Sequence, residues 1–395
     1  MSPAARPPMA DVDFDRAPFL VIWETTQACD LACVHCRAEA IPCRDAGELS
    51  TDEAFQLMRT ARRFGRPLFV LTGGDPAKRP DVVEIVAEGA RLGLRMGMTP
   101  SATPLLTSEL VTDLAGAGLT RLAMSLDGAT AASHDAFRGV GGSFHRTLDT
   151  LQAARGLGLS TQVNTTVTTR TLGELDAVVE LLRDLGISLW SVFFVVPTGR
   201  ATSGDLPSAQ AFEEVFQRMA ALAAQVPFDI KSTAAPHYRR VLVQRQVEAR
   251  RQHGRATPPD PLAGGVGFSM ADGVGRARGV NDGNGFVFVS HRGDIMPSGF
   301  LPLARGNVRT HDLVEVYRKD PLFRSLRDPD LLGGKCGMCE FRTICGGSRA
   351  RAYAMTGDPL AAEPSCAWEP ARWRASRSAS RAASRTLPMI PGRPA

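Results

Sequence analysis

The sequence has no run of 18 or more apolar residues, and residues 1–15 contain no apolar segment of the kind that forms the centre of a signal peptide. These absences predict a protein without a membrane span or export signal, so we expect it in the cytoplasm. Hydrophobic residues make up 44% and charged residues 22% of the 395 residues. This composition excludes a disordered or fibrous chain and suits a large domain joined to a smaller one.

Acidic residues are missing from the segment that follows Glu369, and this explains the net charge of +5. Subtracting the six arginines of that segment from +5 leaves −1 for the rest of the chain. The six are Arg372, Arg374, Arg377, Arg381, Arg385 and Arg393. We therefore expect no nucleic-acid-binding surface on the folded body.

No cysteine occurs between Cys43 and Cys336, so the eight cysteines of the chain form two distant clusters. In a chain without an export signal, clusters of this kind indicate metal sites rather than a disulfide framework.

Short apolar segments alternate with helical patterns over much of the chain, and this predicts an α/β fold. Six strand candidates begin near Phe19, Leu68, Arg95, Arg121, Ser160 and Leu189. Ser50 and Glu53 have the spacing of a capping box at the start of the first helix. Parallel strands joined by helices at this spacing predict a barrel-like sheet that is not fully closed, with its site at the carboxyl ends of the strands.

We expect five segments along the chain. They are a flexible arm (1–17), the barrel (18–205), a helical and loop linker that contributes to the substrate region (206–285), a cysteine-rich domain that begins with a hairpin (286–371) and a disordered basic tail (372–395).

The first cluster places Cys29, Cys33 and Cys36 on the loop after the first predicted strand. Zinc sites usually take four ligands, whereas three thiolates can hold three irons of a [4Fe–4S] cluster and leave the fourth iron open to a small molecule. Buried or zinc-binding cysteines are the alternative interpretation.

A CxxxCxxC motif after the first strand of such a barrel resembles the signature of radical S-adenosylmethionine (SAM) enzymes. The resemblance covers about residues 17–200 and implies a partial (β/α)6 barrel. It also implies a [4Fe–4S] cluster that binds SAM, a flavodoxin- or ferredoxin-like electron donor, and a 5′-deoxyadenosyl radical that removes hydrogen from the substrate.

The resemblance further implies seven SAM-contacting residues. They are Gly73, Gly74, Asp75, Ser125, Asp127, Arg138 and Asn164. Bare glycine backbone would let the ammonium group of SAM approach closely, and an acid beside it suits a cation. Each position has a simpler alternative as a tight turn, a strand-end cap or a solvated arginine. His35 would pack near the adenine or be exposed.

The second cluster consists of Cys336, Cys339, Cys345 and Cys366, which suit zinc or an iron–sulfur cluster. It resembles the C-terminal SPASM/Twitch extension of radical SAM enzymes, in which these cysteines would bind an auxiliary [4Fe–4S] cluster. Full SPASM modules hold two auxiliary clusters. Because this chain has Met296 to Gly299 and Arg349 where further thiolates would fall, we expect one.

The segment from Cys345 to Asp358 resembles radical SAM proteins of siroheme-dependent haem biosynthesis, which act on tetrapyrrole propionates by decarboxylation or side-chain loss. Mycofactocin-type peptide maturases end similarly, so a tetrapyrrole and a peptide both remain possible substrates. A non-catalytic iron–sulfur or zinc protein is a third hypothesis. Five residues could pair with substrate carboxylates: His237, Arg239, Arg240, Arg349 and Arg351. No general acid or base is evident.

Overall fold

The structure is a computed structural model that describes residues 13–253 and 279–385. Its centre is a nine-stranded sheet in the order β7-β6-β5-β4-β3-β2-β1-β8-β9. The first seven strands follow one another in sequence and in space. They are β1 (Leu20–Thr26), β2 (Leu68–Gly73), β3 (Arg95–Met98), β4 (Leu119–Ser125), β5 (Ser160–Val167), β6 (Leu189–Phe194) and β7 (Asp229–Thr233).

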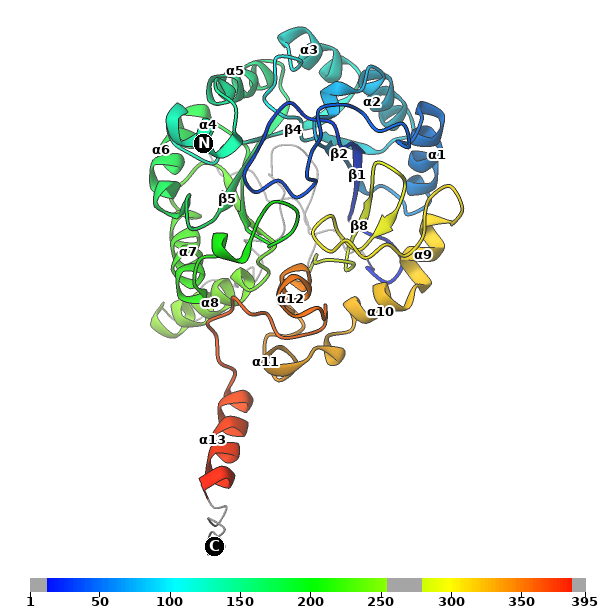
Figure 1. The fold of residues 1–395 in the computed structure, drawn as a ribbon. Helices are drawn as coiled ribbons and strands as arrows, with labels where there is room; N and C mark the ends of the chain where they lie inside the picture. The colour runs from blue at the N-terminus through cyan, green and yellow to red at the C-terminus, as the bar shows by residue number, and fades with distance from the viewer. Residues whose placement is uncertain (1–12, 254–278, 386–395) are drawn as a thin grey trace, which may run out of the picture.

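Helices connect these strands and surround the curved sheet (Figure 1). They are α1 (Thr51–Arg62), α2 (Val82–Arg91), α3 (Ser108–Gly116), α4 (Ala131–Arg138), α5 (Ser143–Gly156), α6 (Leu175–Leu185), α7 (Ala209–Leu222) and α8 (Tyr238–His253). The capping box predicted at Ser50 and Glu53 is confirmed at the start of α1. The open parallel α/β fold is also confirmed, and the sheet continues through β7, beyond the expected boundary at residue 205.

The remaining elements belong to the C-terminal third of the chain. They are β8 (Phe286–Val289), β9 (Ile295–Met296), α9 (Leu313–Lys319), α10 (Pro321–Arg327), α11 (Gly334–Gly337), α12 (Arg349–Thr356) and α13 (Ala371–Arg385). The predicted hairpin is confirmed as β8 and β9. Because β8 also pairs in parallel with β1, the C-terminal region is joined to the barrel through the sheet itself.

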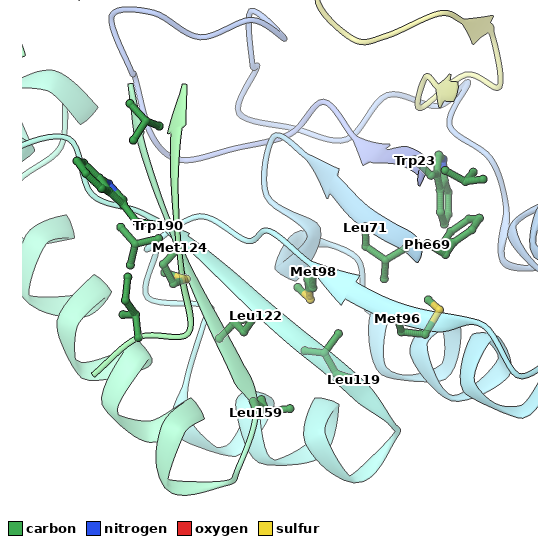
Figure 2. Packing of buried hydrophobic residues seen from close by; sticks show 14 of the residues in the cluster. Trp23, Phe69, Leu71, Met96, Met98, Leu119, Leu122, Met124, Leu159 and Trp190 are labelled. Atoms are coloured by element: carbon green, nitrogen blue, oxygen red, sulfur yellow. The ribbon is translucent and has the colours of Figure 1, made fainter. Parts of the chain in front are cut away.

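Alternation along the strands divides the side chains between the helices and the barrel interior. Leu122 and Met124 of β4 pack in the main hydrophobic cluster, whereas Ala123 and Ser125 line the interior cavity. Figure 2 shows part of this cluster, in which Leu122 and Met124 lie with Trp190 and other buried side chains. Burial of each large apolar side chain contributes about 1.5–3 kcal/mol, so this layer fixes the positions of the strand ends.

The N-terminal arm and the C-terminal tail are more ordered, over their described residues, than the sequence predicts. The described part of the N-terminal arm is held in place, because Phe14 packs with Phe19 and its carbonyl oxygen accepts a hydrogen bond from Tyr317. Residues 371–385 form α13 where disorder was expected, which agrees with the high helix propensity of alanine and arginine, while the rest of the predicted tail lies outside the described residues. Most of the predicted loop over 250–285 lies outside the described residues. None of the described helices is both long and apolar enough to cross a membrane.

Candidate active site and second cysteine site

The first cysteine cluster lies on the loop that follows β1, at the carboxyl ends of the strands. Cys29, Cys33 and Cys36 all line one cavity of about 370 Å³ inside the barrel. The structure thus brings the three predicted ligands together at one interior surface, while Cys43 is exposed and outside it.

Each of the three sulfur atoms has a polar neighbour. The amide of Leu31 donates to Cys29 Sγ at 3.3 Å, and the amide of Ala40 donates to Cys36 Sγ at 3.5 Å. Arg138 Nη1 lies 3.6 Å from Cys33 Sγ. Hydrogen-bond donors of this kind stabilise thiolates, which are the form that binds iron.

Among the residues that the structure describes, no three His, Cys, Asp or Glu side chains are placed to hold one metal ion together.

Two glycines hold the cysteine loop against the end of β2. A Cβ atom added to Gly74 would lie 2.3 Å from the carbonyl oxygen of Ala28, and one added to Gly73 would lie 2.3 Å from that of Thr26. The amide of Gly74 also donates to Thr26 O at 2.8 Å. The glycines are therefore required by contact with the cysteine loop, in addition to lining the cavity where SAM was expected to approach.

We predict that Gly74→Ala displaces the cysteine loop, because the new methyl group cannot fit against the backbone of Ala28. Iron bound at this site and 5′-deoxyadenosine formation should fall by about tenfold or more, which iron analysis and chromatography would measure. Gly116→Ala is the control, because an added Cβ there meets nothing within 4 Å. Normal iron content in the Gly74 variant would contradict this explanation of the glycine.

Asp75 is placed differently from the expectation that it faces SAM. Its buried carboxylate accepts hydrogen bonds from Thr103 Oγ1 at 2.7 Å and from the amides of Ser101 at 3.2 Å and Ala77 at 3.1 Å. Burial raises the pKa of this carboxyl group. Asp75 does not line the cavity, so in this structure it shapes the loop that presents Gly73 and Gly74.

The other predicted contacts lie at the ends of β4 and β5. Ser125 and Asn164 are register partners, and both line the cavity. Asp127 does not line it, but pairs with Arg138, which does. Burial raises the pKa of Asp127, but the positive charge of Arg138 and the amide of Thr166, which donates to the carboxylate, outweigh this, so the pKa of the carboxyl group stays below its usual range. Asp127 thus orients Arg138 between the cysteine loop and the cavity.

His35 also lines the cavity, stacked on Phe137 with 4.3 Å between ring centroids. Its Nε2 atom lies 3.4 Å from Thr166 Oγ1. Burial lowers the pKa of His35 to about 4, so the ring is neutral at physiological pH. This placement agrees with the packing alternative for His35 rather than the exposed one.

One charged group beside the cavity was not predicted, because no local sequence pattern marks it. Glu24 on β1 pairs with Arg37 at 2.7 Å and with His291 at 2.8 Å. Although burial raises the pKa of Glu24, Arg37 and His291 hold it at about 2. Arg37 also donates to the carbonyl oxygen of Gly299 at 3.3 Å, so this group connects the cysteine loop to the C-terminal region.

The second cluster forms a separate small pocket. It is lined by Cys336, Cys339, Cys345 and Cys366, together with His237, Trp368 and their neighbours. Backbone amides donate to three of the four sulfurs at 3.3–3.4 Å. The four predicted ligands thus line one pocket. The sulfur atoms of Cys336, Cys339 and Cys345 each accept a hydrogen bond from a backbone amide, as thiolate ligands of a metal cluster commonly do.

Arg349 occupies the position at which an extension with two auxiliary clusters would have a further cysteine. Its side chain is buried and donates to the carbonyl oxygens of Gly347, Pro359 and Ala361 at 2.8–3.2 Å. Arg349 therefore holds neighbouring backbone segments of the C-terminal region together through these hydrogen bonds.

Most residues suggested for substrate carboxylates have other partners. Arg351 pairs with Glu363, Arg240 pairs with Glu213, and His237 faces the second cysteine pocket. Only Arg239 of the five lines the large cavity, and it donates to the carbonyl oxygens of Val280 and Ile344. Four of the five side chains therefore point to other partners, and Arg239 alone of the five remains at the cavity wall; these contacts between distant segments are not visible in the local sequence.

A parallel partial barrel with three cysteines after its first strand defines a class of SAM-dependent radical enzymes, and comparison with known proteins gives the same class. The model of the radical SAM superfamily matches residues 23–185. The chain belongs to this superfamily and is an enzyme that uses SAM and a [4Fe–4S] cluster.

Relatives that match nearly the whole chain indicate which type of radical SAM enzyme it resembles. The chain is 40% identical over 358 residues to AdoMet-dependent heme synthase of Methanosarcina barkeri, a match that covers 90% of this chain and 98% of that protein. It is 29% identical to the mycofactocin maturase MftC of Mycobacterium tuberculosis, covering 94% of this chain and 92% of that one. The resemblance to the haem-biosynthesis type of radical SAM protein is confirmed.

A solved structure shares the overall fold of this chain. Streptococcus suis SuiB bound to S-adenosylmethionine superposes with a TM-score of 0.67 at 16% identity, over 89% of this chain and 78% of that one.

Proposed function

We propose that this enzyme is a SAM-dependent haem synthase, which converts propionate side chains of an iron porphyrin into vinyl groups. The observation that carries this proposal is the 40% identity to a heme synthase along nearly the whole length of both chains. The cavity beside the three cysteines provides the place where such a substrate would meet SAM. The more distant MftC favours a peptide substrate less strongly.

The [4Fe–4S] cluster and SAM would supply a 5′-deoxyadenosyl radical after one-electron reduction by a flavodoxin- or ferredoxin-like donor. Removal of one hydrogen atom from the propionate CH₂ next to the ring leaves a carbon radical on the side chain. Loss of CO₂ and of one electron then gives the vinyl group. Each propionate therefore needs an electron acceptor as well as a hydrogen acceptor.

The residues of the cavity would divide these tasks. Cys29, Cys33 and Cys36 would bind three irons. Gly73 and Gly74 would contact SAM along their backbone, while Ser125 and Asn164 would bind its ribose and Arg138 its carboxylate. Asp75 and Asp127 would act indirectly, by fixing the loop and Arg138.

We further propose that the second pocket holds one auxiliary [4Fe–4S] cluster in a SPASM/Twitch-like extension. This cluster would accept the electron that the substrate radical loses. Four cysteines beside backbone amide donors support this, and Arg349 argues against a second auxiliary cluster.

Cys339→Ser should lower iron from about eight to about four per chain, because two [4Fe–4S] clusters carry eight. SAM cleavage should persist, since the first cluster is bound by other residues, but vinyl formation should stop for lack of an acceptor. Iron analysis with 5′-deoxyadenosine and porphyrin assays would measure this. Cys43→Ser, which changes an exposed thiol, is the control. Loss of SAM cleavage in the Cys339 variant would contradict an auxiliary role.

The proposed activity is tested by anaerobic incubation of the reconstituted enzyme with dithionite, SAM and iron coproporphyrin III, which carries four propionates. Mass spectrometry should show stepwise loss of CO₂ and two hydrogens, with 5′-deoxyadenosine formed alongside. SAM cleavage that leaves the porphyrin unchanged would reject this substrate and favour a peptide. A bound cluster without SAM cleavage would favour the non-catalytic alternative.

A further inference from the structure

Lysine is scarce in this chain, and one of its four lysines is set apart from the rest. Three have a partner in the protein, namely Asp30 for Lys78, Glu315 for Lys319 and the carbonyl oxygen of Cys366 for Lys335. Lys231 on β7 has no hydrogen bond or ion pair with any residue in the described ranges 13–253 and 279–385. It lines the same cavity as the cysteine loop.

The arginines in the cavity wall are already engaged. Arg37 pairs with Glu24, Arg138 pairs with Asp127, Arg121 bonds to Ser160 and Gln162, and Arg239 bonds to two carbonyl oxygens. Lys231 is thus the cation of this wall for which the described residues supply neither a hydrogen bond nor an ion pair.

The sheet register relates Lys231 to the proposed SAM site. Ser125 pairs with Asn164, Asn164 with Ser191, and Ser191 with Lys231. These residues form one row across four neighbouring strands. Because adjacent strands lie about 4.8 Å apart, Lys231 is about 10 Å along the sheet from Asn164. A ligand that contacts both would have to extend across the cavity.

An uncompensated cation inside a protein is costly, so it is seldom kept without a partner. Burial and the nearby charge of Arg121 lower the pKa of Lys231 to about 7, so this amine loses its charge more readily than a solvent-exposed lysine does. A ligand carboxylate placed against the ammonium group would supply the missing charge.

We propose that Lys231 anchors a carboxylate of the substrate, one that does not react in that turnover, and so sets which propionate lies beside SAM. The inference rests on the proposed function, since it requires a substrate with several carboxylates. Lys231 is a specificity-determining residue at the far side of the cavity from the cysteine loop. Its role is to bind and orient the porphyrin.

The test compares Lys231→Met, which removes the charge at similar length, with Lys231→Arg, which keeps it. Lys319→Met is the control, because Lys319 is exposed and pairs on the surface. Binding of iron coproporphyrin III to the reconstituted holoenzyme without reductant is followed by its absorbance. The Met variant should bind about 10- to 100-fold more weakly, the Arg variant should retain most of the affinity, and the control should be unchanged.

A second ligand separates charge recognition from structural damage. The tetramethyl ester of the same iron porphyrin has no carboxylates, so wild type and Lys231→Met should bind it equally. Equal binding of the free acid by wild type and variant, or equal weakening for acid and ester, would overturn the role of Lys231. Failure of the wild type itself to bind the acid would instead overturn the proposed function.

Discussion

Cys33→Ser should abolish 5′-deoxyadenosine formation. The variant keeps the size of the side chain but replaces a soft thiolate by a hydroxyl group that binds iron poorly. Loss of residues that merely support metal ligands typically costs 10- to 100-fold, so loss of a ligand should lower SAM cleavage by at least about 100-fold. Anaerobic assays with dithionite and chromatography of the nucleoside products would measure the decrease.

Cys43→Ser separates this effect from a general loss of thiols. Cys43 follows the motif closely in sequence, yet it is exposed and does not line the cavity. Its replacement should leave iron content, electron paramagnetic resonance signals and SAM cleavage unchanged. Near-normal SAM cleavage by Cys33→Ser, or a strong loss in Cys43→Ser, would show that the cluster has a different ligand set.

The barrel could be predicted from sequence because its signals are local. Each strand is a short apolar run, and each helix has its own periodicity or cap, as at Ser50 and Glu53. The seventh strand, Asp229–Thr233, was not predicted because it is short and carries two charged residues. Its place in the sheet depends on pairing with β6, which no local pattern encodes.

The site could be predicted where a motif brings its own ligands, as with Cys29, Cys33 and Cys36. The parts of the site that depend on contacts between distant segments could not be predicted from the sequence. Glu24 and His291 lie far apart in sequence, and only the parallel pairing of β8 with β1 brings them together. Asp75 likewise belongs to a motif, but the direction of its carboxylate is set by Ser101 and Thr103 on a later loop.

The same distant contacts explain how the second cysteine region is attached. Arg351 and Glu363 form an ion pair in which both side chains are fully buried. Arg351 also donates to the carbonyl oxygens of Phe194 and Ala234, each at 2.9 Å, at the ends of β6 and β7. Glu363 accepts from the amide of Ser348 at 2.7 Å. The pair therefore connects the cysteine region to the barrel.

Glu363→Gln should destabilise the holoenzyme by about 3–5 kcal/mol, because it leaves the charge of Arg351 buried without its partner. Urea unfolding of the reconstituted protein would measure the change. Glu315→Gln, which breaks an exposed pair with Lys319, should change stability by less than about 0.5 kcal/mol. If the pair docks the second site, iron in the Glu363 variant should fall toward about four per chain while SAM cleavage continues. An unfolding free energy equal to that of the control would mean that the buried pair does not hold the two regions together.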